Sequence, residues 1–161
     1  PMASHIVDQQ NLEERLRETL AQLPQRCAGT VSAIPMELVR CCAATGTAVF
    51  AVQAETWMGN PGGTLHGGMC AVLLDTALGV LVNCLPAGPQ RDDVTVELRL
   101  AYLRPVPLGG TLHLHAQVIK SGSTLLYASG SICLPGEAET PLTTADAVYF
   151  SGGARKGEGR A

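Results

Sequence analysis

The sequence predicts an α+β fold in which a curved antiparallel sheet of five or six strands wraps a long central helix, with an extra helix at the N-terminus. An apolar segment over residues 69–84 is long and rich in Ala and Leu, which favours a helix over a strand. Segments on both sides of it alternate polar and apolar residues, as strands with one buried face do. One long buried helix among several strands fits a sheet that wraps around a helix.

The composition indicates a single globular domain. The chain has 161 residues, of which 46% are hydrophobic and 16% charged, a balance typical of folded proteins. We assign residues 1–35 to an N-terminal helical extension, 36–151 to the main domain and 152–161 to a disordered tail. The formal net charge is −3 and no basic run lies inside the body of the chain, so we expect no nucleic-acid partner.

Targeting signals are not evident in the sequence. The first residues lack the basic-then-apolar pattern of a signal peptide, and the apolar run 69–82 contains Asp75 and is too short to span a bilayer. Six cysteines occur without a CxxC pair, several of them inside apolar runs where Cys behaves as a small hydrophobe. We therefore expect a cytoplasmic protein without disulfides and without membrane association.

The first half of the chain predicts a helix and a hairpin. Leu recurs at positions 12, 16, 20 and 23 with charges between, which indicates an amphipathic helix over 6–23. The tetrapeptide NLEE at 11–14 resembles a capping box, and Pro24 follows the helix. The segments MELVRCCAA and GTAVFAVQA then flank the dipeptide TG, which predicts a β-hairpin.

The second half predicts a buried helix followed by strands. A Gly-rich loop over 59–68 leads into the helix 69–84, which is apolar nearly all round and should be buried on most sides. After a polar loop at 87–92, the segment DVTVELRLAYL alternates, with Val94 and Leu98 on one face and Thr95 and Glu97 on the other. The segments GTLHLHAQVIK and TLLYASGSICL are joined by a turn at 121–123, and a last strand is expected at about 142–150.

One carboxylate, Asp75, stands in the middle of the apolar helix. Buried carboxylates are usually paired or functional, because an unpaired charge in an apolar interior is strongly disfavoured. No Lys or Arg occurs between Arg40 and Arg91, and the neighbours four residues away are Ala71 and Gly79, so no local salt bridge can form. Asp75 either faces solvent, pairs with a distant Arg or serves a site, and we favour a site.

The loop before this helix carries two glycines, Gly67 and Gly68, where the helix presents unpaired N–H groups. They suit a phosphate or a developing oxyanion, or they serve only a tight turn. Phosphate loops usually add a Lys near the helix start, and none is present, so we favour the oxyanion. Gly67 and Asp75 are roughly 12 Å apart along a helix. Both can act on one substrate atom only if a second copy supplies one of them across a two-fold axis.

Two stretches, NPGGTLHGGMCAVLLDTALG and DVTVELRLAYLRPVPLGGTLHLHAQVIKSGSTLLYASGSI, resemble the hotdog-fold acyl-CoA thioesterases. The similarity is greatest to the phenylacetate-pathway and 4-hydroxybenzoyl-CoA thioesterase type and covers about residues 36–150. It implies hydrolysis of an acyl-CoA thioester to a free acid and CoA without a cofactor. It also implies dimers whose sheets join edge to edge, and often tetramers, so we expect a homodimer at least and a homotetramer.

The resemblance also implies roles for individual residues. Asp75 is the nucleophile or general base, the Gly67 amide polarises the thioester carbonyl, and His66 supports that loop. Asn60 would hold the water or the carbonyl, and Thr95 stands near the water. The candidates for substrate binding are Gly68, Arg104, Lys120 and Gly122, and Arg155 and Lys156 could also reach phosphates.

Other arrangements of reactive residues compete with this interpretation. His113 and His115 share one face of a strand, but a metal site needs a third ligand and none is near, so we expect no metal. Cys70 follows His66 by four residues and could form a Cys–His nucleophile pair, although a buried structural Cys is commoner. Trp57 either lines an acyl pocket or fills the core.

Two other functions remain open. A non-catalytic acyl-CoA or small-ligand binding protein on the same fold is the main alternative, but binding alone would not need a costly carboxylate. A hotdog dehydratase is a weaker alternative, because the catalytic His of those enzymes lies in a differently built loop.

Overall fold

The computed structural model describes residues 6–26, 29, 31–87 and 93–151. The elements in chain order are α1 (Gln9–Arg26), η1 (Val31–Ala33), β1 (Met36–Cys42), β2 (Thr47–Gln53), η2 (Thr56–Met58), α2 (Gly67–Cys84), β3 (Val94–Tyr102), β4 (Thr111–Ser121), β5 (Leu125–Cys133) and β6 (Thr143–Phe150). The predicted tail at 152–161, most of the predicted loop at 87–92, and Arg155 and Lys156 lie outside the described residues.

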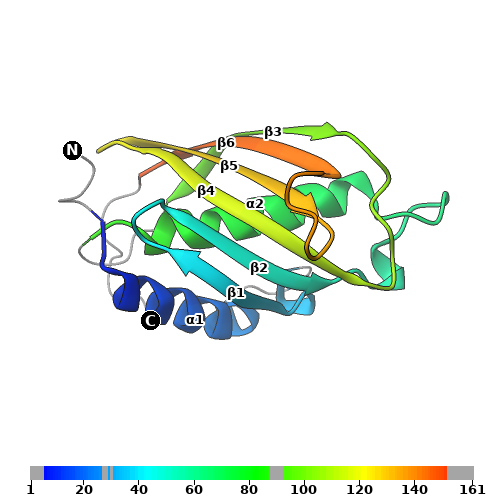
Figure 1. Cartoon of the computed structure of the whole chain (residues 1–161), viewed down its shortest axis with the longest axis horizontal. Helices are drawn as coiled ribbons and strands as arrows, with labels where there is room; N and C mark the ends of the chain where they lie inside the picture. The colour runs from blue at the N-terminus through cyan, green and yellow to red at the C-terminus, as the bar shows by residue number, and fades with distance from the viewer. Residues whose placement is uncertain (1–5, 27–28, 30, 88–92, 152–161) are drawn as a thin grey trace.

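The described strands form one six-stranded sheet in the order β1-β2-β4-β5-β6-β3, and every neighbouring pair is antiparallel. Figure 1 shows α2 lying along one face of this sheet, which we call the inner face, and α1 beside β1. The predicted fold class, a central helix wrapped by an antiparallel sheet with an added N-terminal helix, is confirmed. The predicted hairpin is β1–β2, whereas β3 pairs with β6 and so stands at the edge of the sheet.

The core lies between α2 and the inner face of the sheet. Leu74, Leu78 and Leu81 of α2 are fully buried, as is Phe50 of β2. The fully buried Leu12 and Leu16 of α1 belong to the same hydrophobic cluster, so the N-terminal helix shares the core of the sheet. This shared core does not test the predicted boundary at residue 35 between the N-terminal extension and the main domain, which stays a prediction.

Helix α2 extends beyond the apolar run that defined it in the sequence. It begins at Gly67, and by length and composition alone its 18 residues could cross a membrane. Half of this segment is buried inside the fold, and core helices of globular proteins pass the same test. The helix is thus long enough to span a bilayer, whereas the apolar run 69–82 by itself was judged too short. Its burial inside the fold is nevertheless that of a core helix.

The predicted cap of α1 is wrong. The carboxylate of Asp8 accepts a hydrogen bond from the Asn11 backbone N–H at 2.9 Å, so the helix is capped three residues before the predicted NLEE box. Asn11 reinforces the cap by donating from its side chain to Asp8 at 2.7 Å. The helix also runs through Pro24 to Arg26 and does not end before the proline.

The predicted alternation along β3 is also wrong at its start. The register with β6 shifts between Thr95 and Glu97, which leaves Val96 as a β-bulge. The extra residue turns Thr95 toward α2, onto the side from which Leu98 and Leu100 pack against the core. A strict period of two had placed Thr95 with Glu97 on the opposite face.

Candidate active site

Asp75 lies at the middle of α2, where two hydroxyl groups from the sheet donate hydrogen bonds to it. The Thr95 hydroxyl donates to Asp75 Oδ1 at 2.8 Å from the edge strand β3. The Tyr149 hydroxyl, from β6, lies 3.3 Å from the same oxygen and 3.3 Å from the Asp75 backbone oxygen. Asp75 is half-buried, and no Lys or Arg among the described residues forms an ion pair with it. The structure thus brings the predicted Asp75 and Thr95 together.

Tyr149 was not predicted from the sequence. It is 1% exposed. Burial, reinforced by the Asp75 charge, raises the pKa of its hydroxyl far above the usual range. The phenol therefore stays protonated and donates. Its only sequence signal was a polar-tipped side chain on the buried face of the last predicted strand, where a hydroxyl needs a partner.

The N-terminus of α2 carries one free amide. His66 caps the helix, and its Nδ1 accepts from the Gly68 N–H at 2.9 Å. The Gly68 amide is therefore occupied, whereas the Gly67 N–H bonds to no acceptor among the described residues. A Cβ at Gly67 would lie 3.3 Å from the Tyr102 ring, which explains why a glycine stands there. The free N–H at a helix N-terminus suits a carbonyl oxygen that gains negative charge.

Asn60 stabilises the loop that leads into α2. Its Oδ1 accepts from the Gly62 N–H at 2.9 Å and the Thr64 N–H at 3.2 Å, and its Nδ2 donates to the Thr64 hydroxyl at 3.0 Å. The amide oxygen is thus committed to the loop. Asn60 was expected to hold a water molecule or a carbonyl. Only the second N–H of its amide remains available for that role.

A cavity of about 400 Å³ opens beside this helix N-terminus. Asn60 and Gly67 line it, together with Cys70 from the first turn of α2 and Tyr102 and Arg104 from the end of β3 and beyond. The Tyr102 hydroxyl donates to the Gly67 backbone oxygen at 3.0 Å and so closes one side. Asp75 does not line this cavity, as expected from its position two turns further along the helix.

The candidate substrate-binding residues lie at opposite ends of the sheet. The Arg104 backbone N–H donates to the Leu142 carbonyl just before β6, whereas Lys120 pairs with Tyr127 near the far end. The two ends are about 20 Å apart along the strands. Gly122 belongs to the far end as well, where a Cβ would lie 2.7 Å from the Leu125 backbone oxygen. The turn alone therefore requires that glycine, and one chain does not gather these candidates.

Comparison with known proteins shows which family part of the chain resembles. The profile of the thioesterase superfamily matches residues 62–140, the segment that holds Gly67, Asp75 and Thr95. Over that segment, just under half of the chain, the protein is similar to the thioesterase superfamily.

A curated relative is similar in sequence, and solved structures are similar in fold. Human acyl-coenzyme A thioesterase 13 is 33% identical over 87 residues, 54% of this chain and 61% of that protein, so the match spans less than two thirds of the relative. The solved structure of the E. coli PaaI protein from the phenylacetic acid degradation operon superposes with a TM-score of 0.71 at 21% identity, over 89% of this chain and 97% of that one. The structure of smu.793 from Streptococcus mutans bound to acetyl CoA superposes with a TM-score of 0.65 at 21% identity, over 81% and 95% of the two chains.

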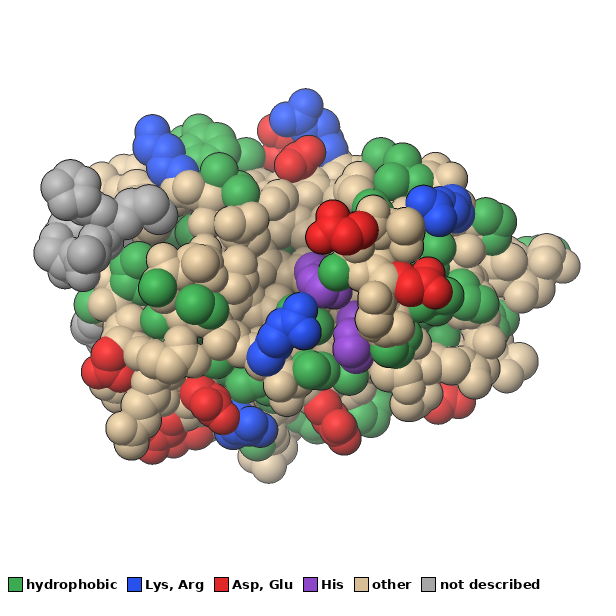
Figure 2. Space-filling model, in the orientation of Figure 1, with side chains coloured by type: hydrophobic (Ala, Val, Ile, Leu, Met, Phe, Trp, Pro, Cys, Tyr) green, Lys and Arg blue, Asp and Glu red, His purple; other side chains and the backbone are tan. Residues whose placement is uncertain are grey.

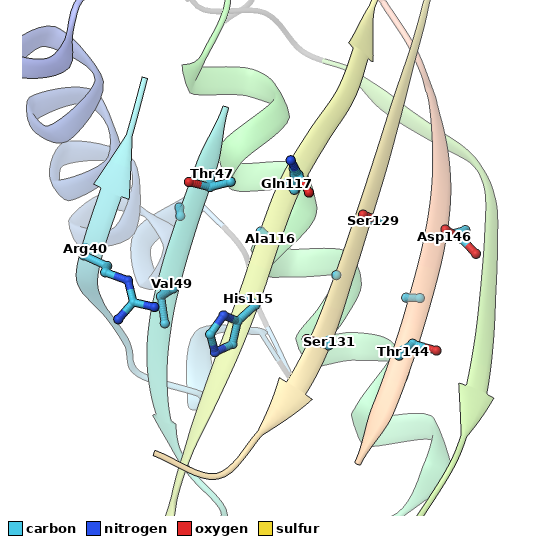
Figure 3. Close-up of a pocket in the computed structure, with 13 residues that line it drawn as sticks. Arg40, Thr47, Val49, His115, Ala116, Gln117, Ser129, Ser131, Thr144 and Asp146 are labelled. Carbon is cyan, nitrogen blue, oxygen red and sulfur yellow. The ribbon is translucent and has the colours of Figure 1, made fainter. Parts of the chain in front are cut away.

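The chain has a second hollow, of about 430 Å³, on the outer face of the sheet. In Figure 3, Arg40 and His115 lie on either side of Val49, with Asp146 two strands further on. Figure 2 shows histidine side chains near the middle of this face and scattered charges of both signs around them. Burial, Arg40 and His113 lower the pKa of His115.

The competing arrangements find little support in the structure. His113 and His115 have ring centroids 6.4 Å apart, but no group of three metal-ligating residues occurs in the described part of the chain. Burial raises the pKa of the Cys70 thiol, and His66 Nδ1 is bonded to Gly68, so the pair needed for a cysteine nucleophile is not formed. The five cysteines within the described ranges are free thiols. Trp57 is 54% exposed and neither fills the core nor lines the cavity of this chain.

Proposed function

We propose that the protein hydrolyses acyl-CoA thioesters to a free acid and CoA. The observation that carries the proposal is a carboxylate on the central helix whose Oδ1 receives hydroxyl hydrogen bonds, together with a Gly67 N–H at the helix N-terminus that has no acceptor among the described residues. The match of residues 62–140 to the thioesterase superfamily supports the reaction. The name of the human relative and the acetyl CoA bound to the Streptococcus mutans protein support an acyl-CoA as the substrate.

Asp75 has two chemical routes open to it. As a nucleophile it attacks the thioester carbon, expels the CoA thiolate and leaves an acyl anhydride that water hydrolyses. As a general base it takes a proton from a water molecule that attacks the same carbon directly. In both routes the Gly67 N–H stabilises the negative charge that develops on the carbonyl oxygen.

The site proposed here needs two copies of the chain. Strand β3 is an edge of the sheet, and its Val94, Val96 and Tyr102 are 58–61% exposed. An open edge strand is a template for a second strand. Thr95, at one end of β3, bonds to Asp75, and Tyr102, at the other end, bonds to Gly67.

If two β3 strands pair antiparallel across a two-fold axis, the Thr95 end of one strand lies beside the Tyr102 end of the other. Asp75 of one chain then approaches the Gly67 amide and the adjacent cavity of its partner. We propose such a homodimer, with a homotetramer as the larger assembly and a cytoplasmic location.

A release assay tests the function. The purified protein is incubated with a panel of short, long and aromatic acyl-CoAs, and free CoA is measured with a thiol reagent. We expect turnover of at least one acyl-CoA, lost in Asp75→Asn. Tight binding of an acyl-CoA without release of CoA would instead support the non-catalytic binding protein, and no release from any member of the panel contradicts the proposal.

A further inference from the structure

The two oxygens of the Asp75 carboxylate have different surroundings. Oδ1 accepts from the Thr95 hydroxyl at 2.8 Å and lies 3.3 Å from the Tyr149 hydroxyl. Oδ2 has no hydrogen bond within the described part of the chain, and it is not among the fully buried polar atoms there. Rotation of the carboxylate by half a turn would exchange the two oxygens. Donors that hold one oxygen prevent this rotation, so the other oxygen is the one that can react.

Thr95 and Tyr149 differ in how firmly they are held. Thr95 is exposed on the edge strand beside the bulge at Val96. Tyr149 is fully buried on β6, paired with Thr95 on one side and Leu126 on the other. A buried phenol must find an acceptor, and Tyr149 has Asp75 Oδ1 and the Asp75 backbone oxygen, each at 3.3 Å. Tyr149 is thus the donor that packing holds in place.

We propose that Tyr149 is a positioning residue for thioester hydrolysis. Together with Thr95 it fixes Asp75 Oδ1, and it thereby presents Oδ2 to the thioester carbon or to the attacking water. Tyr149 itself does not touch the substrate. This inference rests on the function proposed above.

The test removes one hydroxyl and keeps the ring. Tyr149→Phe should lower kcat by about tenfold, because a misaligned carboxylate attacks less often, with KM within about twofold of the parent. Tyr127→Phe is the matched control, since Tyr127 is 41% exposed on the outer face and makes no contact with Asp75. A kcat for Tyr149→Phe within about twofold of the parent would overturn the inference while leaving the proposed function intact.

Coupling with Thr95 separates positioning from a general effect on the fold. If both hydroxyls act on one oxygen, Thr95→Val and Tyr149→Phe together should cost less than the product of their separate losses in kcat. Losses that multiply would mean that Tyr149 acts elsewhere. Should Tyr149→Phe not fold, a ring-fluorinated tyrosine at position 149 makes the hydroxyl more acidic and keeps both the ring and the hydroxyl. It must alter kcat where the same replacement at position 127 does not, and an unchanged kcat contradicts the inference.

Crystal structures decide the matter independently of turnover. In Tyr149→Phe the Asp75 carboxylate should leave the orientation that it has in the parent, whereas in Tyr127→Phe it should keep it. If the parent releases no CoA from any acyl-CoA, the proposed function fails, and the orientation of this carboxylate still tests the role of Tyr149. An unchanged carboxylate in Tyr149→Phe overturns the inference.

Discussion

Two hollows of similar volume lie in different parts of this molecule. The one at the N-terminus of α2 measures about 400 Å³ and the one on the outer face of the sheet about 430 Å³. The outer hollow has more charged groups, yet within the described part of the chain its Arg40, His115 and Asp146 make no hydrogen bond or ion pair through their side chains. Beside the helix, by contrast, His66, Tyr102 and Thr95 each hold a neighbouring group by a hydrogen bond of 3.0 Å or less.

The difference shows that neither volume nor charge marks the candidate site. Catalysis depends on reactive groups that stay in a fixed geometry, and such groups are held by packing and hydrogen bonds from rigid elements. The inner region meets this condition and the outer one does not. Substitutions made in pairs, one in each region, test whether only the inner region is catalytic.

The largest difference between the two regions is expected when one carboxylate in each is replaced. Asp75→Asn should lower kcat by at least about a hundredfold while the protein stays folded, because a nucleophile or base is lost. Asp146→Asn, the matched change in the outer hollow, should leave kcat within about twofold of the parent. Steady-state release of CoA measures both. An Asp75→Asn variant that keeps more than a tenth of the parental kcat contradicts the assignment of Asp75.

The second prediction asks whether the inner site is shared between chains. Asp75→Asn and Gly67→Pro should each be inactive, the latter because proline has no N–H, provided that circular dichroism shows it folded. Unfolded and refolded together, they should form heterodimers in about half of the population and recover roughly a quarter of the parental activity, since one site in four is intact. If mass spectrometry shows heterodimers but the mixture stays inactive, the two groups act within one chain.

A smaller effect is expected from the cap of α2. His66→Ala should lower the free energy of unfolding by about 1 kcal/mol, because the Gly68 N–H loses its acceptor. It should also lower kcat about threefold to tenfold, because the adjacent Gly67 amide is less well oriented. His66→Asn restores a good cap and should recover most of both quantities, and His113→Ala on the outer face should leave kcat unchanged. Failure of His66→Asn to improve on His66→Ala would show that capping is not what His66 contributes.

The smallest effect concerns pH and the outer hollow. The pKa of His115 is lowered in the folded chain by burial and by the nearby Arg40 and His113, so below about pH 6.5 the unfolded chain binds the proton more readily. Stability should therefore decline as the pH falls through this range and be regained as it rises. His115→Gln should reduce the decline, measured as Tm between pH 5 and 8, without changing kcat. An unchanged dependence of Tm on pH would exclude His115 as its source.

Much of the fold was determined by local patterns in the sequence. Period-two alternation and the turn at 45–46 were sufficient for the hairpin β1–β2, and the length and apolar character of 69–84 were sufficient for α2. Asp75 was detected because a carboxylate without a local partner is conspicuous in an apolar helix, and Gly67 because glycines at a helix start leave an amide accessible. These signals arise within a few residues of one another, so the sequence carries them directly.

The tertiary structure decided what depends on distant pairing. Tyr149 meets Asp75 across 74 residues of chain, and only the placement of β6 under α2 brings them together. The bulge at Val96 turned Thr95 to the inner face, because one extra residue reverses the side on which a strand's residues point. The exposed edge at β3 follows from its pairing with β6 and not with β4, which follows it in the chain. Local periodicity contains none of these relations, because each depends on which strands pair and in what register.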